Sequence, residues 1–327
     1  MTNTDPARTP LVDVHAHFLT DHYIQAATDA GHRYPDGVPG WPSWNAAQHL
    51  ELMDQWGIAT AILSISSPGV SFGDPTATQA LARHVNDAGA EIHRAHPSRF
   101  GHFASLPLPD VDAALTELAY AMDQLGGDGV TTETNIDGIY LGDARYEPLL
   151  VELDRRHTPV FVHPTSPLHP EAVSLGRPRP MLEFLFDTTR TVSDLVFTGR
   201  LERYPDIPWI FTHGGGTLPL LTDRMELFRS GMGLDNSTGP ALPVPEQVGR
   251  LWFDMAGTPF PHQIPALTTA FGSEHLLYGS DYCWTPAPAA AIQVDSVDSA
   301  PQPGGDTWRG LTTRNAYRLF PRLADPS

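Results

Sequence analysis

Two histidines, His15 and His17, follow a short apolar run in the stretch LVDVHAHF at residues 11–18. Alternate residues of a β-strand point to the same face, so both imidazoles can point at one metal ion. Neutral imidazole suits a borderline divalent metal such as zinc. The chain has 15 histidines, however, and this spacing alone does not distinguish a metal clamp from two ordinary histidines.

Three more side chains of metal-binding type come directly after apolar runs. His163 ends the run in PVFVHP, His213 ends the run in WIFTHGGG, and Asp281 follows the run in LLYGSDY. If the runs are parallel strands of one barrel, their carboxyl ends meet at one mouth, where such barrels carry their active sites. Five such side chains in these places favour one polar site over scattered core or surface histidines.

Histidines combined with one aspartate indicate two kinds of metal chemistry. Such a donor set leaves room for water or substrate, as a catalytic metal site requires. The ion can act as a Lewis acid and template, or it can lower the pKa of a bound water and generate hydroxide. A single carboxylate ligand also leaves a net positive centre, which attracts an anion.

The rest of the chain supplies the elements that would position these residues. Short apolar runs alternate with longer segments of helical periodicity, a pattern that predicts βα units and a parallel sheet. The predicted strands are 11–14, 59–64, 100–106, 129–132, 159–162, 208–212, 251–254 and 275–278. Eight strands with intervening helices predict a (β/α)8 barrel, of the class α/β.

We expect one barrel domain at residues 11–323, preceded by a flexible N-terminus at residues 1–10. Two stretches rich in Gly, Pro or Ala, at 231–246 and 285–306, are predicted to be long loops, the second with a helical segment inside it. A domain linker is the alternative interpretation. We expect no signal peptide and no membrane-spanning helix. The single cysteine, Cys283, excludes an internal disulfide and fits a cytoplasmic location.

The charge of the chain limits its partners. The formal net charge of −18 argues against nucleic acid, whose phosphates would be repelled. All 20 basic residues are arginine, so no lysine forms a Schiff base or a carbamylated bridge between two metals. We therefore expect a small-molecule partner, with neither nucleic acid nor a membrane involved.

The motifs together resemble a known family. The H-x-H after the first strand, FVHP, RLERYPDIPWIFTHGGG and YGSDY look like the amidohydrolase superfamily, in its aminocarboxymuconate-semialdehyde decarboxylase-like branch. MDQWGIATAILSISSPG, YLGDARYEPLLVELDRR and NAYRLFPRL are similar to the 6-methylsalicylate decarboxylase type. The resemblance covers residues 11–323 and implies a distorted TIM barrel of the metal-dependent hydrolase type.

The resemblance also implies roles for individual residues. His15, His17, His163 and Asp281 would hold one divalent metal ion, and His213 and Asp281 would act in catalysis. Some relatives have Glu in place of the first histidine. His15 therefore favours Zn2+, with Mn2+ as the alternative. Many relatives are dimers, so we expect a homodimer.

Two departures from the family pattern bear on mechanism and substrate. Some relatives pair the histidine of the sixth strand with a glutamate a few residues later, but HGGGTLP contains none, so that proton relay is not transferred. His49 stands where the muconate enzyme carries a substrate-binding arginine, which argues against the muconate substrate.

The predicted activity is non-oxidative decarboxylation of a hydroxybenzoate or salicylate-type aromatic carboxylate. The alternative is hydrolysis of an amide, lactone or ester by a metal-activated water. Seven residues near the ligand-bearing loops are candidate substrate contacts, with core packing or helix support as their alternative role. An apolar slot for a ring is predicted from the aromatic ones, and the full set is Phe18, Trp41, Trp44, His49, Arg190, Tyr282 and Trp284.

Overall fold

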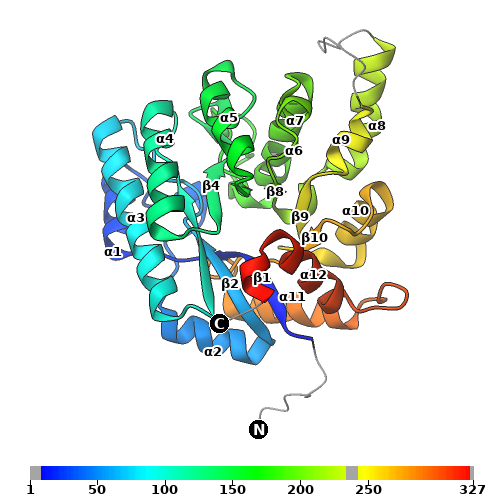
Figure 1. The fold of residues 1–327 in the computed structure, drawn as a ribbon, viewed down its shortest axis with the longest axis horizontal. Helices are drawn as coiled ribbons and strands as arrows, with labels where there is room; N and C mark the ends of the chain where they lie inside the picture. The colour runs from blue at the N-terminus through cyan, green and yellow to red at the C-terminus, as the bar shows by residue number, and fades with distance from the viewer. Residues whose placement is uncertain (1–8, 233–241, 325–327) are drawn as a thin grey trace.

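A closed barrel of parallel strands forms the centre of the molecule. The computed structural model describes residues 9–232 and 242–324. Eight parallel strands lie in the order β1-β2-β3-β4-β7-β8-β9-β10. β1 then meets the end of the sheet through bridges from Asp13 to Tyr278 and from Ala16 to Tyr282. Helices surround the strands (Figure 1), so the predicted (β/α)8 barrel is confirmed.

Every strand of the barrel lies where an apolar run predicts one. The strands are β1 (Leu11–His17), β2 (Ile58–Ser64), β3 (Phe100–Ser105), β4 (Gly129–Glu133), β7 (Val160–His163), β8 (Trp209–Phe211), β9 (Trp252–Asp254) and β10 (Leu276–Leu277). A short antiparallel pair, β5 (Asn135–Ile136) with β6 (Ile139–Tyr140), follows β4 and was not predicted.

The helices follow the strands in βα order. They are α1 (Asp21–Asp29), α2 (Ala46–Trp56), α3 (Pro75–Ala95), α4 (Val111–Tyr120), α5 (Glu147–Arg156), α6 (Glu183–Phe197), α7 (Arg200–Arg203), α8 (Leu218–Glu226), α9 (Val244–Val248), α10 (Ile264–Phe271), α11 (Ala287–Ser299) and α12 (Trp308–Leu319). Single turns lie at η1 (Pro35–Gly37), η2 (Ala121–Leu125), η3 (Ala144–Tyr146), η4 (Pro170–Ala172), η5 (Arg179–Met181), η6 (His213–Gly215), η7 (Leu227–Gly231), η8 (Pro259–Gln263) and η9 (Pro321–Ala324).

Local sequence explains where several helices begin and end. The side chains of Asn45 and Asp110 accept hydrogen bonds from backbone amides of the first turns of α2 and α4, which satisfies donors that a helix start leaves free. Gly57 ends α2 with φ 67°, a left-handed conformation that glycine adopts without steric cost.

The interior of the barrel is apolar at its base and polar at its mouth. Val12, Val14, Phe103 and Phe161 belong to a buried cluster that also includes Phe320 after α12. The pairing of β1 with β2 is irregular between Asp13 and Ala16. Such an irregularity changes the alternation of side chains along a strand. Val14 therefore joins the apolar interior while the next residue, His15, also packs inside, against Phe161.

Two predicted loops differ from expectation or lie partly outside the described residues. The helical segment expected inside the stretch 285–306 is present as α11 and takes up most of that stretch, so the loop around it is shorter than predicted. Pro286 and Pro288 fall at the cap and in the first turn of the helix, where proline is compatible with helical geometry. Residues 233–241 of the other stretch lie outside the described residues, as do residues 1–8 of the predicted flexible N-terminus.

Residues 9–232 and 242–324 contain no helix with the length and apolar character needed to cross a membrane.

Candidate metal centre and adjoining cavity

Four of the predicted ligands converge at the mouth of the barrel. His15, His17, His163 and Asp281 each offer one donor atom, and these atoms lie within 4.8 Å of one another. The Nε2 atoms of His15 and His17 are 3.1 Å apart, and Oδ1 of Asp281 is 3.5 Å and 3.2 Å from them. Three imidazoles and a carboxylate at this spacing fit one divalent cation.

The ring nitrogens that face away from the cluster each meet a protein oxygen. Nδ1 of His15 is 2.8 Å from Oδ2 of Asp254, and Nδ1 of His17 is 3.1 Å from Oγ of Ser64. Nδ1 of His163 lies 2.7 Å from the carbonyl oxygen of the next residue, Pro164. Contacts of this kind fix the orientation of a metal-ligating ring and leave Nε2 for the ion.

The charge state of the cluster also suits a cation. Burial lowers the pKa of His17, and it lowers that of His163 well below the usual range, so both rings are neutral as metal ligands must be. Burial opposes ionisation of Asp281, but the neighbouring side chains of His17, His213 and His15 hold its pKa well below the usual range.

Asp254 contacts the site, although its place in the sequence did not single it out. It ends β9, is fully buried, and its Oδ1 accepts hydrogen bonds from the backbone amides of His213 and Ala256, both at 2.9 Å. Burial lowers the pKa of His15, but the carboxylates of Asp254, Asp281 and Asp13 together outweigh burial and raise it. One carboxylate therefore orients both a ligand and the backbone of His213. The sequence does place an acidic residue at the end of a predicted strand, which is the feature that could have identified Asp254.

His213 lies at the edge of the cluster. Its Nε2 is 3.6 Å from Oδ2 of Asp281, and its Nδ1 is 2.9 Å from Oγ1 of Thr212. The glycines after it allow this position: a Cβ on Gly216, where φ is 63°, would lie 2.2 Å from the carbonyl oxygen of Leu185. These contacts hold the His213 ring beside Asp281, outside the four-residue cluster.

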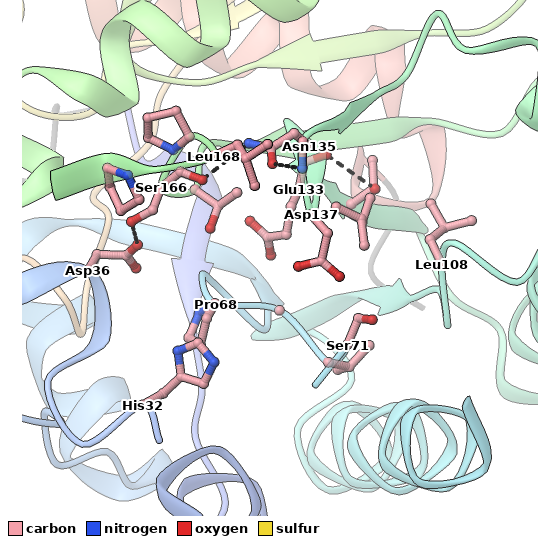
Figure 2. Close-up of a pocket in the computed structure, with 18 of the residues that line it drawn as sticks. His32, Asp36, Pro68, Ser71, Leu108, Glu133, Asn135, Asp137, Ser166 and Leu168 are labelled. Atoms are coloured by element: carbon pink, nitrogen blue, oxygen red, sulfur yellow. Dashed lines mark hydrogen bonds between the residues drawn. The ribbon is translucent and has the colours of Figure 1, made fainter. Parts of the chain in front are cut away.

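A cavity of about 310 Å³ adjoins the cluster on the side of β2, β3 and β4. Apolar residues form much of its wall, and polar ones reach into it. Figure 2 shows Glu133 and Asp137 on one side, with Pro68 and Ser71 facing them. The four candidate ligands do not line this cavity, but Oε2 of Glu133 is 3.8 Å from Nδ1 of His163. Glu133 therefore lies between the cavity and the cluster.

The seven candidate substrate contacts are not part of this cavity wall. Phe18, His49 and Tyr282 are buried, and the His49 and Tyr282 rings lie 4.7 Å apart. Nε1 of Trp44 donates to Nδ1 of His49, and burial lowers the pKa of His49 to about 3. These residues form a packed aromatic group beside β1, and their contact with substrate stays a prediction.

The remaining candidates lie elsewhere around the mouth. The rings of Trp41 and Trp284 are 5.5 Å apart. Arg190 lies on α6 and forms an ion pair of 3.2 Å with the buried Asp187. Its half-exposed side chain supports that buried carboxylate, and a role in substrate binding stays a prediction.

The fold and the donor cluster are those of a metal-dependent barrel. Similarity to known proteins identifies its family. The sequence model of the amidohydrolase family matches residues 12–322, so the chain belongs to that family. The chain is 36% identical over 328 residues to a decarboxylase of Penicillium terrestre, covering 95% of each chain. It is also 36% identical to a 6-methylsalicylic acid decarboxylase of Aspergillus aculeatus, covering 95% of this chain and 96% of that one.

A solved structure supports the same assignment. A crystal structure described as an amidohydrolase II has a TM-score of 0.87 and 33% identity, over 95% of this chain and 99% of that chain. The resemblance noted from HAHF, FVHP, FTHGGG and YGSDY is therefore confirmed at the level of the family.

Proposed function

We propose that this protein is a metal-dependent decarboxylase of a hydroxybenzoate-type aromatic acid. The observation that carries the proposal is the four-residue donor cluster beside a ring-sized cavity. Two relatives that match nearly the full chain are named as decarboxylases, one of them for 6-methylsalicylic acid. These names favour decarboxylation over the hydrolysis that the same donor set would also support.

The proposed cofactor is one divalent ion held by His15, His17, His163 and Asp281. Zinc is proposed because three neutral imidazoles and one carboxylate form a typical zinc donor set, with manganese as the alternative. When bound, the ion supplies Lewis-acid and template chemistry for a carboxylate and its neighbouring hydroxyl. Its net positive charge also attracts an anionic acid to a chain with a formal charge of −18.

Residues of the chain itself are proposed to transfer the proton that decarboxylation requires. Decarboxylation replaces the bond from the ring to the carboxyl carbon with a C–H bond, so one proton must reach that ring carbon. We propose that Asp281 delivers this proton and that His213 supplies it, because Oδ2 and Nε2 are 3.6 Å apart. Positioned acid–base groups of this kind typically contribute about 10²–10⁴-fold to rate.

The test is metal analysis of the purified protein, followed by a panel of hydroxybenzoates assayed for CO2. In deuterated water the product should carry deuterium at the former carboxyl position. The proposal fails if amides, lactones or esters are turned over with incorporation of oxygen from labelled water and no aromatic acid releases CO2. That result would establish the hydrolase alternative.

We also propose that the protein is a homodimer. Large apolar side chains are exposed at Leu175, Met181, Leu220 and Leu227. Exposed apolar surface of this kind is typical of protein–protein contacts. Sedimentation equilibrium would detect a mass near 36 kDa if the proposal is wrong, since one chain has a mass of 35.7 kDa. The cytoplasmic location stays a prediction.

A further inference from the structure

One buried tyrosine hydroxyl belongs neither to the donor cluster nor to the cavity wall. Tyr23 lies on α1 and is fully buried. Its hydroxyl group donates to the carbonyl oxygens of Gly69, at 2.9 Å, and of Ser66, at 3.3 Å. A buried tyrosine hydroxyl usually has a hydrogen-bond partner, so these bonds alone do not indicate a role beyond the fold. What matters is what the bonded segment contacts.

The bonded segment is a tight turn in the loop after β2, at residues 66–69, which we call the serine turn. The backbone amide of Gly69 donates to the carbonyl oxygen of Ser66 at 3.0 Å, so the two carbonyl groups that meet Tyr23 stand at the two ends of the turn. Burial raises the pKa of Tyr23 well above its usual value, so the hydroxyl keeps the hydrogen that it donates. Tyr23 therefore holds both ends of the serine turn.

The first residue of the serine turn packs against a candidate metal ligand. Oγ of the buried Ser66 is 3.2 Å from Nε2 and 3.5 Å from Nδ1 of His163. An oxygen at nearly equal distances from both ring nitrogens cannot lie in line with the lone pair of either one. Ser66 thus limits the tilt of the His163 ring and leaves Nε2 for an ion.

The other end of the serine turn forms part of the cavity wall. Pro68 and Gly69 line the cavity, and Figure 2 shows Pro68 facing Glu133. A Cβ on Gly69 would lie 3.0 Å from Cγ of Glu133, so the backbone of the turn closely approaches that side chain. Oγ of Ser67 is 2.7 Å from Oγ1 of Thr165, which also lines the cavity.

We infer that Tyr23 is a positioning residue for both parts of the site. By holding the serine turn, its hydroxyl group sets the orientation of His163 and the position of the cavity wall beside Glu133. The inference rests on the metal site of the proposed function and does not depend on which acid is the substrate. It predicts that loss of one remote hydroxyl group weakens metal binding and substrate binding together.

The experiment uses Tyr23→Phe, which removes the hydroxyl and keeps the ring that packs 5.6 Å from Trp41. Zinc affinity is measured on the metal-free protein by competition with a chelator. We expect the zinc dissociation constant to rise about tenfold, at the lower end of the effect of losing a group that orients a ligand. With metal saturating, KM for an accepted hydroxybenzoate should rise about two- to tenfold, as loss of one hydrogen bond typically gives.

Tyr146→Phe is the matched control. Tyr146 is also buried, but its hydroxyl has no hydrogen-bond partner among the described residues and it does not line the cavity. Zinc affinity and KM should stay within twofold of the wild type. The inference is overturned if Tyr23→Phe lowers only the urea midpoint of the metal-free protein, with zinc affinity and KM unchanged, or if Tyr146→Phe reproduces its effects.

Ser66→Ala tests the route to the metal site with the turn itself retained. The variant removes the contact with His163, so the zinc dissociation constant should rise about as much as in Tyr23→Phe. An unchanged zinc affinity in Ser66→Ala would overturn the inference. Zinc affinity is measured without turnover, so it decides the inference even if no aromatic acid releases CO2, a result that would refute only the proposed reaction.

Discussion

The buried polar groups on the two sides of the barrel mouth differ in whether they have hydrogen-bond partners. On the side of the metal cluster, at the ends of β1, β7, β9 and β10, each cluster histidine has a protein oxygen behind its ring, and Asp254 alone meets His15, His213 and Ala256. On the side of β4, Thr131 and Glu133 are buried but lack partners. The side chains on the first side, the organised side, are held in place before a ligand binds, as catalysis requires. The second side has unmet hydrogen bonds for a ligand to satisfy, which suits recognition.

The largest effect should follow removal of a ligand on the organised side. His163→Ala should lose the metal and reduce kcat/KM by on the order of a thousandfold or more, because the catalytic groups act as a unit. Metal content by mass spectrometry and circular dichroism check this together. His157→Ala, at an exposed histidine, is the matched control. Full metal content in folded His163→Ala would contradict the ligand set.

His213→Asn should separate catalysis from metal binding. We expect kcat to fall by about 10²–10⁴-fold, because a positioned acid–base group is lost. The metal content should stay at the wild-type level, since His213 is outside the four-residue cluster. Loss of metal in this variant would make His213 a ligand and would redefine the organised side.

Asp254→Asn tests whether the organisation itself matters. Removing a carboxylate behind a ligating histidine typically costs about 10–100-fold in metal affinity or activity. Competition with a chelator measures the affinity, and Asp112→Asn, at an exposed helical position, is the control. An unchanged affinity together with an unchanged kcat would show that the hydrogen bonds of Asp254 serve only the fold.

The protein should also lose stability as the pH falls, and this loss must be measured separately from any effect of pH on catalysis. Burial lowers the pKa of His49 to about 3 and that of His102 to about 4. Both pKa values are below the unfolded value of about 6.5, so below that pH the unfolded state binds more protons. Their contribution is complete above pH 6.5 and falls by about 1.4 kcal/mol per pH unit for each histidine as pH drops towards 4.

Urea unfolding of the metal-free protein at several pH values measures this dependence. His102→Gln should reduce the slope between pH 6 and 4.5 by about 1.4 kcal/mol per pH unit, because one buried neutral histidine is removed. An identical slope in the variant would show that His102 accepts a proton in the folded state.

The smallest effect is expected at Arg190. Its ion pair with Asp187 is half exposed, and such pairs usually contribute less than about 1 kcal/mol. Arg190→Gln should therefore change KM by less than about twofold. A tenfold rise in KM would place the carboxylate of the substrate near α6 and would move the recognition side away from β4.

The sequence predicted the elements of the organised side well, for a simple physical reason. Buried strands of a parallel barrel are continuous apolar runs, and a polar residue at the end of such a run is conspicuous. His15, His163 and Asp281 all stand out in this way. Asp254 stands in the same kind of place, but a single aspartate at the end of a strand does not by itself indicate a site.

The predicted ring slot illustrates why substrate contacts were harder to predict. Phe18 directly follows the candidate ligand His17 at the end of β1, and consecutive residues of a strand point to opposite faces. Tyr282 follows Asp281, whose φ of 58° departs from extended geometry. Both side chains are buried away from the cavity. Thr131 and Glu133 lie in GVTTE, whose polar letters carry no sign of which face they occupy until the register with β7 is known.

The irregular end of β1 has a consequence for the order of assembly. The backbone amide of Val14 bonds to the carbonyl of Tyr278, and the amide of Asp281 bonds to the carbonyl of His15. The seam that joins the first and last strands therefore runs through the metal ligands. A chain emerging from the ribosome cannot complete the site until residue 281 has returned to residue 15, so metal capture would report that the barrel has closed. An ion bound there would link the first strand to the segment after the last strand and so stabilise the closed barrel.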